Sequence, residues 1–118
     1  MVRKRVLIVD DHDTFRDAAR DLLEAAGFDV VGLAADGFEA LVEVERLMPD
    51  IVLLDVQLPG LDGFAVAEHL AARASAPDVV LISGRDAVTY GDRVGQASVV
   101  GFLSKRELNG ASLAGLLD

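Results

Sequence analysis

Five short runs of aliphatic residues divide the chain, and each is about as long as one β-strand. Four of them, at residues 6–9, 51–54, 79–82 and 99–103, are almost continuously apolar, and a shorter, mixed run covers 29–33. Gly, Pro or polar residues bound these runs. Runs of this length with such boundaries indicate strands that are buried on both faces, as in a parallel sheet.

Between these runs, apolar residues recur every three or four positions, which predicts amphipathic helices. The first helix begins at Asp13 and stops at Gly27, and the second is capped by Asp36 and closed by Pro49. The expected buried stripes of four successive helices are Phe15, Ala18, Ala19, Leu22, Leu23 and Ala26; Gly37, Ala40, Leu41, Val44, Leu47 and Met48; Gly63, Val66, Ala67 and Leu70; and Leu108, Ser112, Gly115 and Leu116.

The segment from Asp86 to Ala97 is the weakest of the expected helices. It contains Gly91 and Gly95, each of which costs about 0.5–1 kcal/mol relative to alanine inside a helix. We therefore expect this segment to be mobile. Phe38 and Val42 fall outside the buried stripe of their helix, and we interpret them as incidental surface residues rather than a contact surface.

Strand and helix alternate five times along the chain. This alternation predicts an α/β fold with a doubly wound, five-stranded parallel sheet, right-handed connections and about five helices divided between both faces of the sheet. With 118 residues, of which 52% are apolar, the chain has the size of one ordinary domain, and we expect a single domain over residues 1–118.

Composition and charge exclude several classes of function. Without cysteine there is no disulfide framework, thiolate metal site or thiol nucleophile. The formal net charge of -9 argues against a nucleic-acid groove, which needs clustered Lys and Arg. No apolar run is long enough to span a bilayer and no signal peptide is recognisable, so we expect a cytoplasmic protein without membrane contact.

Reactive side chains follow four of the apolar runs. Because the carboxyl ends of parallel strands meet at one edge of a doubly wound sheet, we expect these side chains to converge there. They are Asp10 and Asp11 after the first run, Asp55 after the run at 51–54, Ser83 after the run at 79–82 and Lys105 after the last run.

Three converging carboxylates would repel one another unless a cation were present. Mg²⁺ is the natural cation for ligands that are all oxygen atoms. Together with Lys105 such an ion would balance the three acids and attract a phosphoryl group. Asp55, at the centre, is placed to act as a carboxylate nucleophile, while Lys105 and Ser83 would stabilise the phosphoryl oxygens.

In these features the chain resembles the receiver (response regulator) domain of two-component signalling. The resemblance covers essentially the whole chain, and its segments are Asp10-Asp11, Asp55 to Gly63, Ser83-Gly84 and Gly101 to Lys105. It implies a flavodoxin-like fold with sheet order 2-1-3-4-5. It also implies that a sensor histidine kinase is a partner and supplies a phosphoryl group to Asp55 from a phosphohistidine.

The resemblance implies further roles at the metal site. Asp11 and Asp55 would bind Mg²⁺ directly, helped by the backbone carbonyl of Gln57, and Asp10 would hold the ion through water. We interpret His12, next to these acids, as an exposed loop residue rather than a ligand, since Mg²⁺ prefers oxygen.

By the same resemblance, Lys105 would pair with the acid and then with the phosphoryl group. Ser83 would be the switching hydroxyl and Phe102 the switching aromatic residue. Phe102 lacks the hydroxyl of the tyrosine that is commoner at this position. Arg106 follows Lys105 where many receivers carry proline, which weighs against the family's usual cis peptide at that bond. We draw no signal from Tyr90.

The resemblance also concerns partners and activity. Phosphorylation would change the face formed by the fourth helix, fifth strand and fifth helix, and a homodimer through this face is one outcome that the family suggests. An output domain or a downstream protein would read the change. The domain would assist its own phosphorylation and dephosphorylation without being an enzyme for free substrates.

Three other functions are compatible with parts of the pattern. An aspartate-nucleophile phosphotransferase or phosphatase would need a second acid two residues after the nucleophile for proton transfer, and that residue is Gln57. A docking module that works without phosphorylation would not need the complete set of acids, hydroxyl and lysine. A flavin-binding protein on the same fold is the least favoured.

Overall fold

The computed structural model describes residues 3–117, and Met1, Val2 and Asp118 lie outside the described range. Its parallel sheet has the order β2-β1-β3-β4-β5, which confirms the expected fold. The elements are β1 (Arg5–Val9), α1 (Asp13–Ala25), β2 (Asp29–Ala34), α2 (Gly37–Leu47), β3 (Ile51–Asp55), α3 (Gly63–Ala71), β4 (Asp78–Ser83), the 3₁₀ turn η1 (Ala87–Tyr90), α4 (Arg93–Gln96), β5 (Gly101–Ser104), the 3₁₀ turn η2 (Lys105–Glu107) and α5 (Gly110–Leu117).

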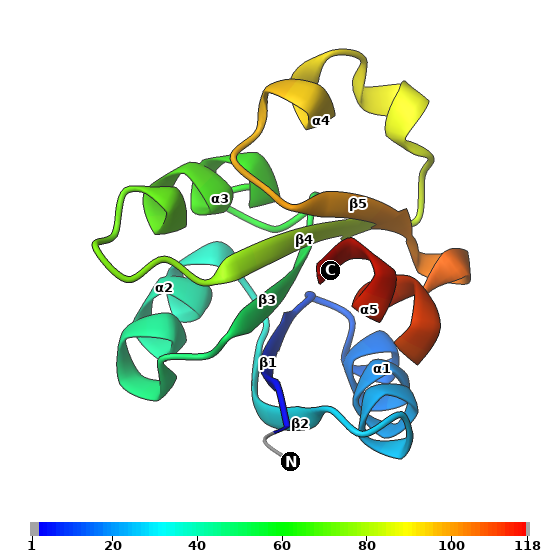
Figure 1. The fold of residues 1–118 in the computed structure, drawn as a ribbon. Coiled ribbons are helices and arrows are strands. Elements are labelled where there is room, and N and C mark those ends of the chain that lie inside the picture. Colours follow the sequence, from blue (N-terminus) through cyan, green and yellow to red (C-terminus); the bar gives the residue numbers. More distant parts are fainter. Residues whose placement is uncertain (1–2, 118) are drawn as a thin grey trace.

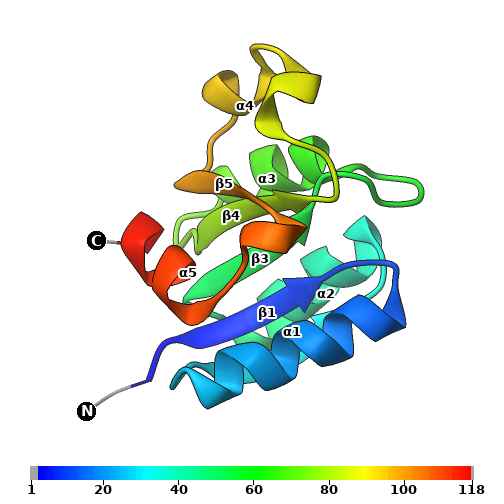
Figure 2. The same ribbon diagram turned by 90° about the vertical axis from the view of Figure 1, so that its right-hand side faces the viewer.

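Helices cover both faces of the sheet. In Figure 1, α1 and α5 lie on one face and α2 and α3 on the other, and the turned view of Figure 2 shows the same two layers. The segment with η1 and α4 lies beyond β5, at one edge of the sheet. Among residues 3–117, none of the helices combines the length and apolar character needed to cross a lipid bilayer.

The strand residues alternate between two apolar layers, which explains why the strand runs are continuously apolar. In β1, Val6 and Ile8 pack with α1 and α5, whereas Leu7 and Val9 pack with α2 and α3. The other inner strands follow the same period of two, as expected when successive side chains point to opposite faces. The inner strands β1, β3 and β4 are therefore covered on both faces, and their polar side chains lie at the strand ends.

Two helical stripes are narrower than the sequence pattern indicates. In α1, Ala19 and Leu23 are buried, but Leu22 is 41% exposed and Ala18 and Ala26 lie at the surface. This helix contacts the outer part of the sheet, β1 and β2, and so only a narrow stripe of it is covered. Met48 was also expected in the core, but it is exposed.

The position of Met48 has a local cause. It follows α2 with a left-handed backbone (φ 48), which ends the helix and turns its side chain away from the buried stripe of α2. Phe38 and Val42, each 63% exposed, lie outside the core as expected.

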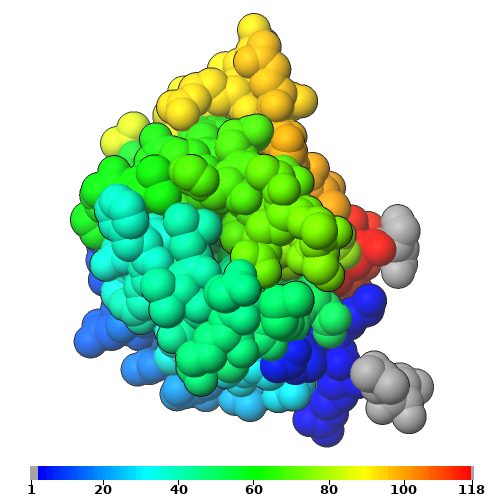
Figure 3. Space-filling model, turned by 90° about the vertical axis from the view of Figure 1, so that its left-hand side faces the viewer, coloured from blue at the N-terminus to red at the C-terminus, as the bar shows by residue number. Residues whose placement is uncertain are grey.

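The expected helix over 86–97 does not form as one element. The chain makes η1, turns at Gly91 with φ +59, and then makes α4, a single turn. Gly91 is the break because its backbone is left-handed, a conformation that glycine adopts without steric cost. The space-filling view shows this yellow and orange segment standing out from the rest of the surface (Figure 3). Its mobility stays a prediction.

The last two elements also differ from the pattern. The fifth strand begins at Gly101 rather than at residue 99. In α5 the core residue is Leu113, which is fully buried, whereas Gly115 is exposed and Ser112 makes hydrogen bonds at the start of the helix. The expected core residue Leu108 is buried, just before this helix.

Gly63, at the start of α3, fixes the helix against the end of β3. Its N–H donates to the carbonyl of Val56, and a Cβ at this position would overlap the carbonyl oxygen of Asp55 and the Cα of Val56. Asp62 caps the same helix by accepting from the N–H of Ala65 at 2.9 Å. The turn after Asp55 is therefore held by backbone contacts that leave no room for a side chain.

We predict that Gly63→Ala lowers the free energy of unfolding by about 1–3 kcal/mol, because the added methyl group overpacks rigid backbone. The matched control is Gly115→Ala in α5, where a Cβ meets nothing within 4 Å. That substitution should raise the free energy of unfolding by about 0.5–1 kcal/mol. Urea unfolding followed by circular dichroism measures both, and equal effects of the two substitutions would contradict the packing argument.

Candidate functional site

The register of the sheet brings the predicted acids together. Val9 lies opposite Leu54 in the paired strands β1 and β3, so the next residues, Asp10 and Asp55, leave neighbouring strands at the same level. Both side chains are buried, with Asp10 fully covered and Asp55 3% exposed. Two carboxylates therefore enter the interior at one end of an otherwise apolar sheet.

Lys105 joins these two acids. Its Nζ lies 2.5 Å from Asp10 Oδ2 and 3.2 Å from Asp55 Oδ2, and it lies 4.4 Å from the centroid of the Phe15 ring. The side chain reaches the acids from the end of β5, two strands away from β3. A single ammonium group thus compensates part of the negative charge of two buried carboxylates.

Backbone N–H groups hold the other oxygens of the two acids. Asp10 Oδ1 accepts from the N–H of His12 at 2.8 Å, and Asp55 Oδ1 accepts from the N–H of Gln57 at 3.1 Å. Arg16 also donates to the backbone carbonyl of Asp10 at 2.6 Å. Each carboxylate thus has one oxygen toward a backbone donor and one toward Lys105.

Asp11 and His12 form the exposed side of the cluster. Nδ1 of His12 lies 3.1 Å from an oxygen of Asp10 and 3.1 Å from an oxygen of Asp11. The His12 side chain is 69% exposed, as expected for a loop residue, but its contact with both acids was not anticipated. The sequence places His12 next to the acids without showing which way its ring turns.

The residues fit a hard divalent cation. Ligand atoms of Asp10, Asp11, His12 and Asp55 all lie within 4.8 Å of one another. Three carboxylates and one ammonium leave a formal charge of two negative units, and carboxylate oxygen is the ligand that Mg²⁺ prefers. The described structure supplies carboxylate oxygen atoms for such an ion.

The three buried charges shift one another's pKa values. Burial raises the pKa of Asp55 to about 6, and the charge of Asp10 adds to this, while the N–H of Gln57 and the charge of Lys105 oppose it. Burial acts in the same direction on Asp10, but the hydrogen bond and charge of Lys105, with the N–H of His12, hold its pKa below the usual range. Burial alone would lower the pKa of Lys105, yet the two acids raise it.

Ser83 and Phe102 lie beside this cluster but belong to the apolar layer that faces α2 and α3. Ser83 continues the alternation of Val79 and Leu81, and Phe102 packs against the same apolar layer. Ser83 is fully buried, but its hydroxyl contacts Oη of Tyr90 at 2.6 Å and makes no hydrogen bond to Asp55 or Lys105 within the described structure. The structure therefore brings Ser83 to the edge of the site without joining it to the acids.

Tyr90 is the residue that sequence reasoning missed. Its ring lies 5.7 Å from that of Phe64 and 6.1 Å from that of Phe102, measured between ring centroids. No local pattern marks it, because it stands in a segment of weak helical character and only the turn of η1 directs it inward.

Arg106, next to Lys105, forms an ion pair with Asp86, and no described peptide bond is cis.

We predict that Asp55→Asn stabilises the domain in the absence of divalent metal. The pKa of Asp55 is about 6 in the folded protein, whereas that of an unfolded aspartate is near 4. Between these two pH values the unfolded state releases the proton first, so the free energy of unfolding falls as the pH rises. The gain in unfolding free energy from Asp55→Asn should be on the order of 2 kcal/mol at pH 7.5 and should vanish below about pH 4.

Urea unfolding in EDTA at a series of pH values measures this difference. Adding excess Mg²⁺ at pH 7.5 serves as the control, because a cation that binds the folded acids should stabilise the unsubstituted protein more than Asp55→Asn. A stability difference that does not change with pH would contradict the assignment of the raised pKa to Asp55.

Known proteins with similar sequences are longer than this chain. The chain is 49% identical over 80 residues to a protein-glutamate methylesterase/protein-glutamine glutaminase of Myxococcus xanthus, covering 67% of this chain and 23% of that protein. It is 35% identical over 101 residues to the DNA-binding transcriptional activator EvgA of Escherichia coli, covering 86% of this chain and 50% of that protein. The chain thus spans half or less of the length of these relatives.

Solved structures show the same fold. The signal receiver domain of the putative response regulator NarL from Mycobacterium tuberculosis superposes with a TM-score of 0.87 at 33% identity, covering 99% of this chain and 98% of that one. A family profile described as the response regulator receiver domain matches residues 6–114. The chain therefore belongs to the response regulator receiver domains of two-component signalling.

Proposed function

We propose that this domain is a switch controlled by phosphorylation of Asp55. The observation that carries the proposal is the bridge of Lys105 between the buried Asp10 and Asp55. An ammonium group held on two carboxylates at the end of β3 is placed to meet the oxygens of an incoming phosphoryl group. The roles proposed for Asp10, Asp55 and Lys105 rest on their contacts in this structure, together with the chemistry that is usual in the family.

The proposed reaction is a transfer from a phosphohistidine of a sensor histidine kinase. A carboxylate oxygen of Asp55 forms a bond to phosphorus while the bond from phosphorus to the histidine nitrogen breaks, and that nitrogen keeps the electron pair. Lys105 offsets charge on the phosphoryl oxygens, and the N–H of Gln57 stays as a donor to Asp55. The result is an acyl phosphate on the domain.

Asp10, Asp11 and Asp55 would hold Mg²⁺, with the Gln57 carbonyl as a further ligand. When bound, this ion supplies positive charge that offsets the acids and the phosphoryl oxygens. The protein's own contribution is to keep three carboxylates close together at a site where two of them are shielded from water. A cation bound there would reduce the repulsion between the three acids that Lys105 leaves uncompensated.

The response of the domain would involve Ser83 and Phe102. Ser83 would donate a hydrogen bond to the phosphoryl group, Phe102 would move with it, and the surface formed by η1, α4, β5 and α5 would change. Because the matched region covers only half or less of several relatives, we infer an output domain or a downstream protein as the reader of that surface. A homodimer through the same surface is part of this proposal.

The phosphatase alternative has less support in the site. The residue two positions after Asp55 is Gln57, which is exposed and offers an amide where proton transfer would need an acid. Steady release of phosphate from a phosphomonoester over many turnovers would support that alternative. A phosphorylation-independent docking module would instead bind its partner equally well after Asp55→Ala.

We predict that the purified domain gains the mass of one phosphoryl group when incubated with Mg²⁺ and acetyl phosphate. Asp55→Asn should abolish the gain, and EDTA should suppress it in the unsubstituted protein. Asp78→Asn is the matched control, because Asp78 is an exposed aspartate at the opposite end of the sheet. Intact-protein mass spectrometry makes the measurement, and a mass gain that survives Asp55→Asn would refute the proposal.

We also predict that Lys105→Met slows phosphorylation by acetyl phosphate by about 10–100-fold, as expected when a positioned charge on the transferring group is lost. Lys4 is the other lysine of the chain and lies at the opposite end of β1, so Lys4→Met is the control and should react at the normal rate. The rate of the mass gain at fixed donor concentration measures both variants. Equal rates for Lys105→Met and the unsubstituted domain would remove Lys105 from the proposed site.

A further inference from the structure

The hydroxyl of Ser83 is already engaged in this structure. Its Oγ lies 2.6 Å from Oη of Tyr90, and it accepts from the N–H of Arg85 at 3.0 Å. A serine side chain has one rotatable bond, so its hydroxyl occupies one staggered position at a time. The position found here is fixed from two sides, by a side chain and by the backbone.

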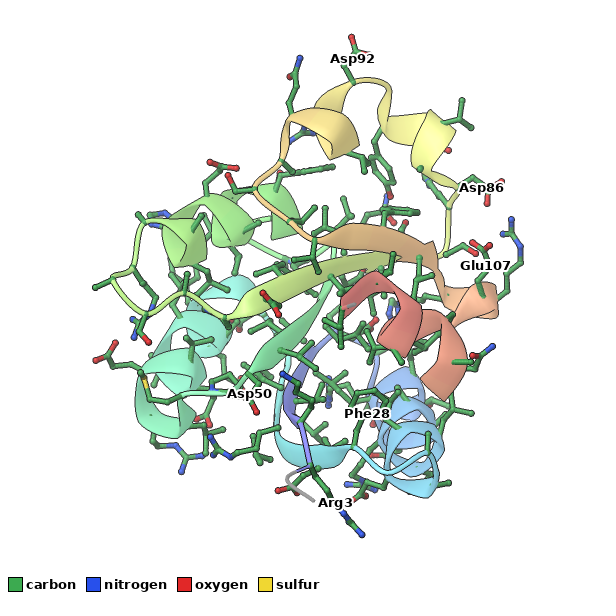
Figure 4. The ribbon with its side chains drawn as sticks, viewed as in Figure 1. Arg3, Phe28, Asp50, Asp86, Asp92 and Glu107 are labelled. Atoms are coloured by element: carbon green, nitrogen blue, oxygen red, sulfur yellow. The ribbon has the colours of Figure 1, made fainter. Side chains whose placement is uncertain are left out.

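Tyr90 is the last residue of η1, the turn that follows β4 and lies beside β5. Asp86 and Asp92, labelled in Figure 4, precede η1 and α4 and mark the two ends of this stretch. The Tyr90 ring packs between Phe64 of α3 and Phe102 of β5. It is part of the apolar layer on the α2 and α3 face, so its hydroxyl is carried to Ser83 by ring packing.

The neighbours of Tyr90 keep the segment close to α3. The guanidinium of Arg93 lies 4.1 Å from the centroid of the Phe64 ring and 3.8 Å from a carboxylate oxygen of Asp62. Glu68 of α3 accepts from the N–H of Ser98, just after α4. These contacts are at the surface and individually weak. Tyr90 is the point at which the segment contacts the buried edge of the candidate site.

A Ser83 hydroxyl that donates to a phosphoryl group on Asp55 has to leave its present position. Within the described structure it makes no hydrogen bond to Asp55, and its close contact is with Tyr90 instead. Either hydroxyl can be the donor of this hydrogen bond, but the Ser83 side chain occupies one staggered position at a time, so it cannot contact Oη of Tyr90 and turn to a phosphoryl oxygen together. Tyr90 and a phosphoryl group therefore compete for the same side chain.

We propose that Tyr90 is a positioning residue that holds the Ser83 hydroxyl away from Asp55 in the unphosphorylated domain. The hydrogen bond between the two hydroxyls is broken when Ser83 turns to the phosphoryl group. The released Tyr90 ring then shifts together with the Phe102 ring that packs against it, and this passes the change to η1 and β5. This inference rests on the proposed function, because it needs a phosphoryl group on Asp55.

This arrangement has a specific consequence for Phe102. Phe102 has no hydroxyl, so it cannot itself bond to Ser83, and the structure supplies a hydroxyl from a different segment. The aromatic ring on β5 and the hydroxyl that contacts Ser83 are thus divided between two residues, 6.1 Å apart between ring centroids. The two rings have to move together, because they pack against each other.

The test is the affinity of the domain for beryllofluoride, a phosphoryl analogue, with saturating Mg²⁺. Tyr90→Phe keeps the ring and removes only the hydroxyl, so the resting position of Ser83 loses a partner. We expect this variant to bind beryllofluoride about 2–10-fold more tightly, the effect of one hydrogen bond between neutral groups. Amide NMR resonances of residues 83–85 in the unliganded variant should shift toward their positions in the beryllofluoride-bound, unsubstituted domain.

Ser83→Ala provides the control for a merely structural effect. In the Ser83→Ala background, adding Tyr90→Phe should leave the beryllofluoride affinity unchanged, because the partner hydroxyl is absent. Unchanged or weaker binding by the Tyr90→Phe variant would overturn the role of Tyr90, and so would an equal gain in the two backgrounds. If the unsubstituted domain neither binds beryllofluoride nor accepts a phosphoryl group from acetyl phosphate, the proposed function itself fails and this inference with it.

Discussion

The site depends on one ammonium group that lies between two buried carboxylates. Without Lys105, Asp10 and Asp55 would be buried charges of the same sign, offset by backbone donors and by the exposed ring of His12 beside Asp10, a costly arrangement in a protein interior. The lysine can reach both acids only if β5, β4, β3 and β1 keep their order and register. The apolar packing of the sheet and the charge balance of the site thus require the same strand arrangement.

The period of two along the strands separates the parts of the site. Asp55 and Lys105 continue the alternation of Leu53 and Leu103, which face α1 and α5, whereas Ser83 and Phe102 belong to the layer that faces α2 and α3. The acids and the Ser83 hydroxyl are therefore neighbours at the carboxyl ends of the strands, but they continue two different apolar layers of the protein. Tyr90 packs against the second layer, so the proposed change at Ser83 would reach the side of the sheet that faces α2 and α3.

Much of the fold could be predicted from the sequence because its signals are local. The continuous runs in β1, β3 and β4 mark buried strands, and the topology then brings Asp10, Asp55 and Lys105 to one edge. What could not be predicted depends on contacts between distant segments. The sequence pattern does not show how much of α1 the sheet covers, that Gly91 divides a helix, or that the turn of η1 directs Tyr90 to Ser83.

The close packing of Gly63 bears on how sequences of this kind can vary. The carbonyl group of Asp55 and the Cα of Val56 occupy the space that a Cβ at position 63 would need. Any substitution of Gly63 therefore requires the turn after β3 to shift. A designer who wished to remodel the loop from Val56 to Asp62 would have to keep this glycine or rebuild the helix start with it. The position constrains engineering of the loop more strictly than the exposed residues around it.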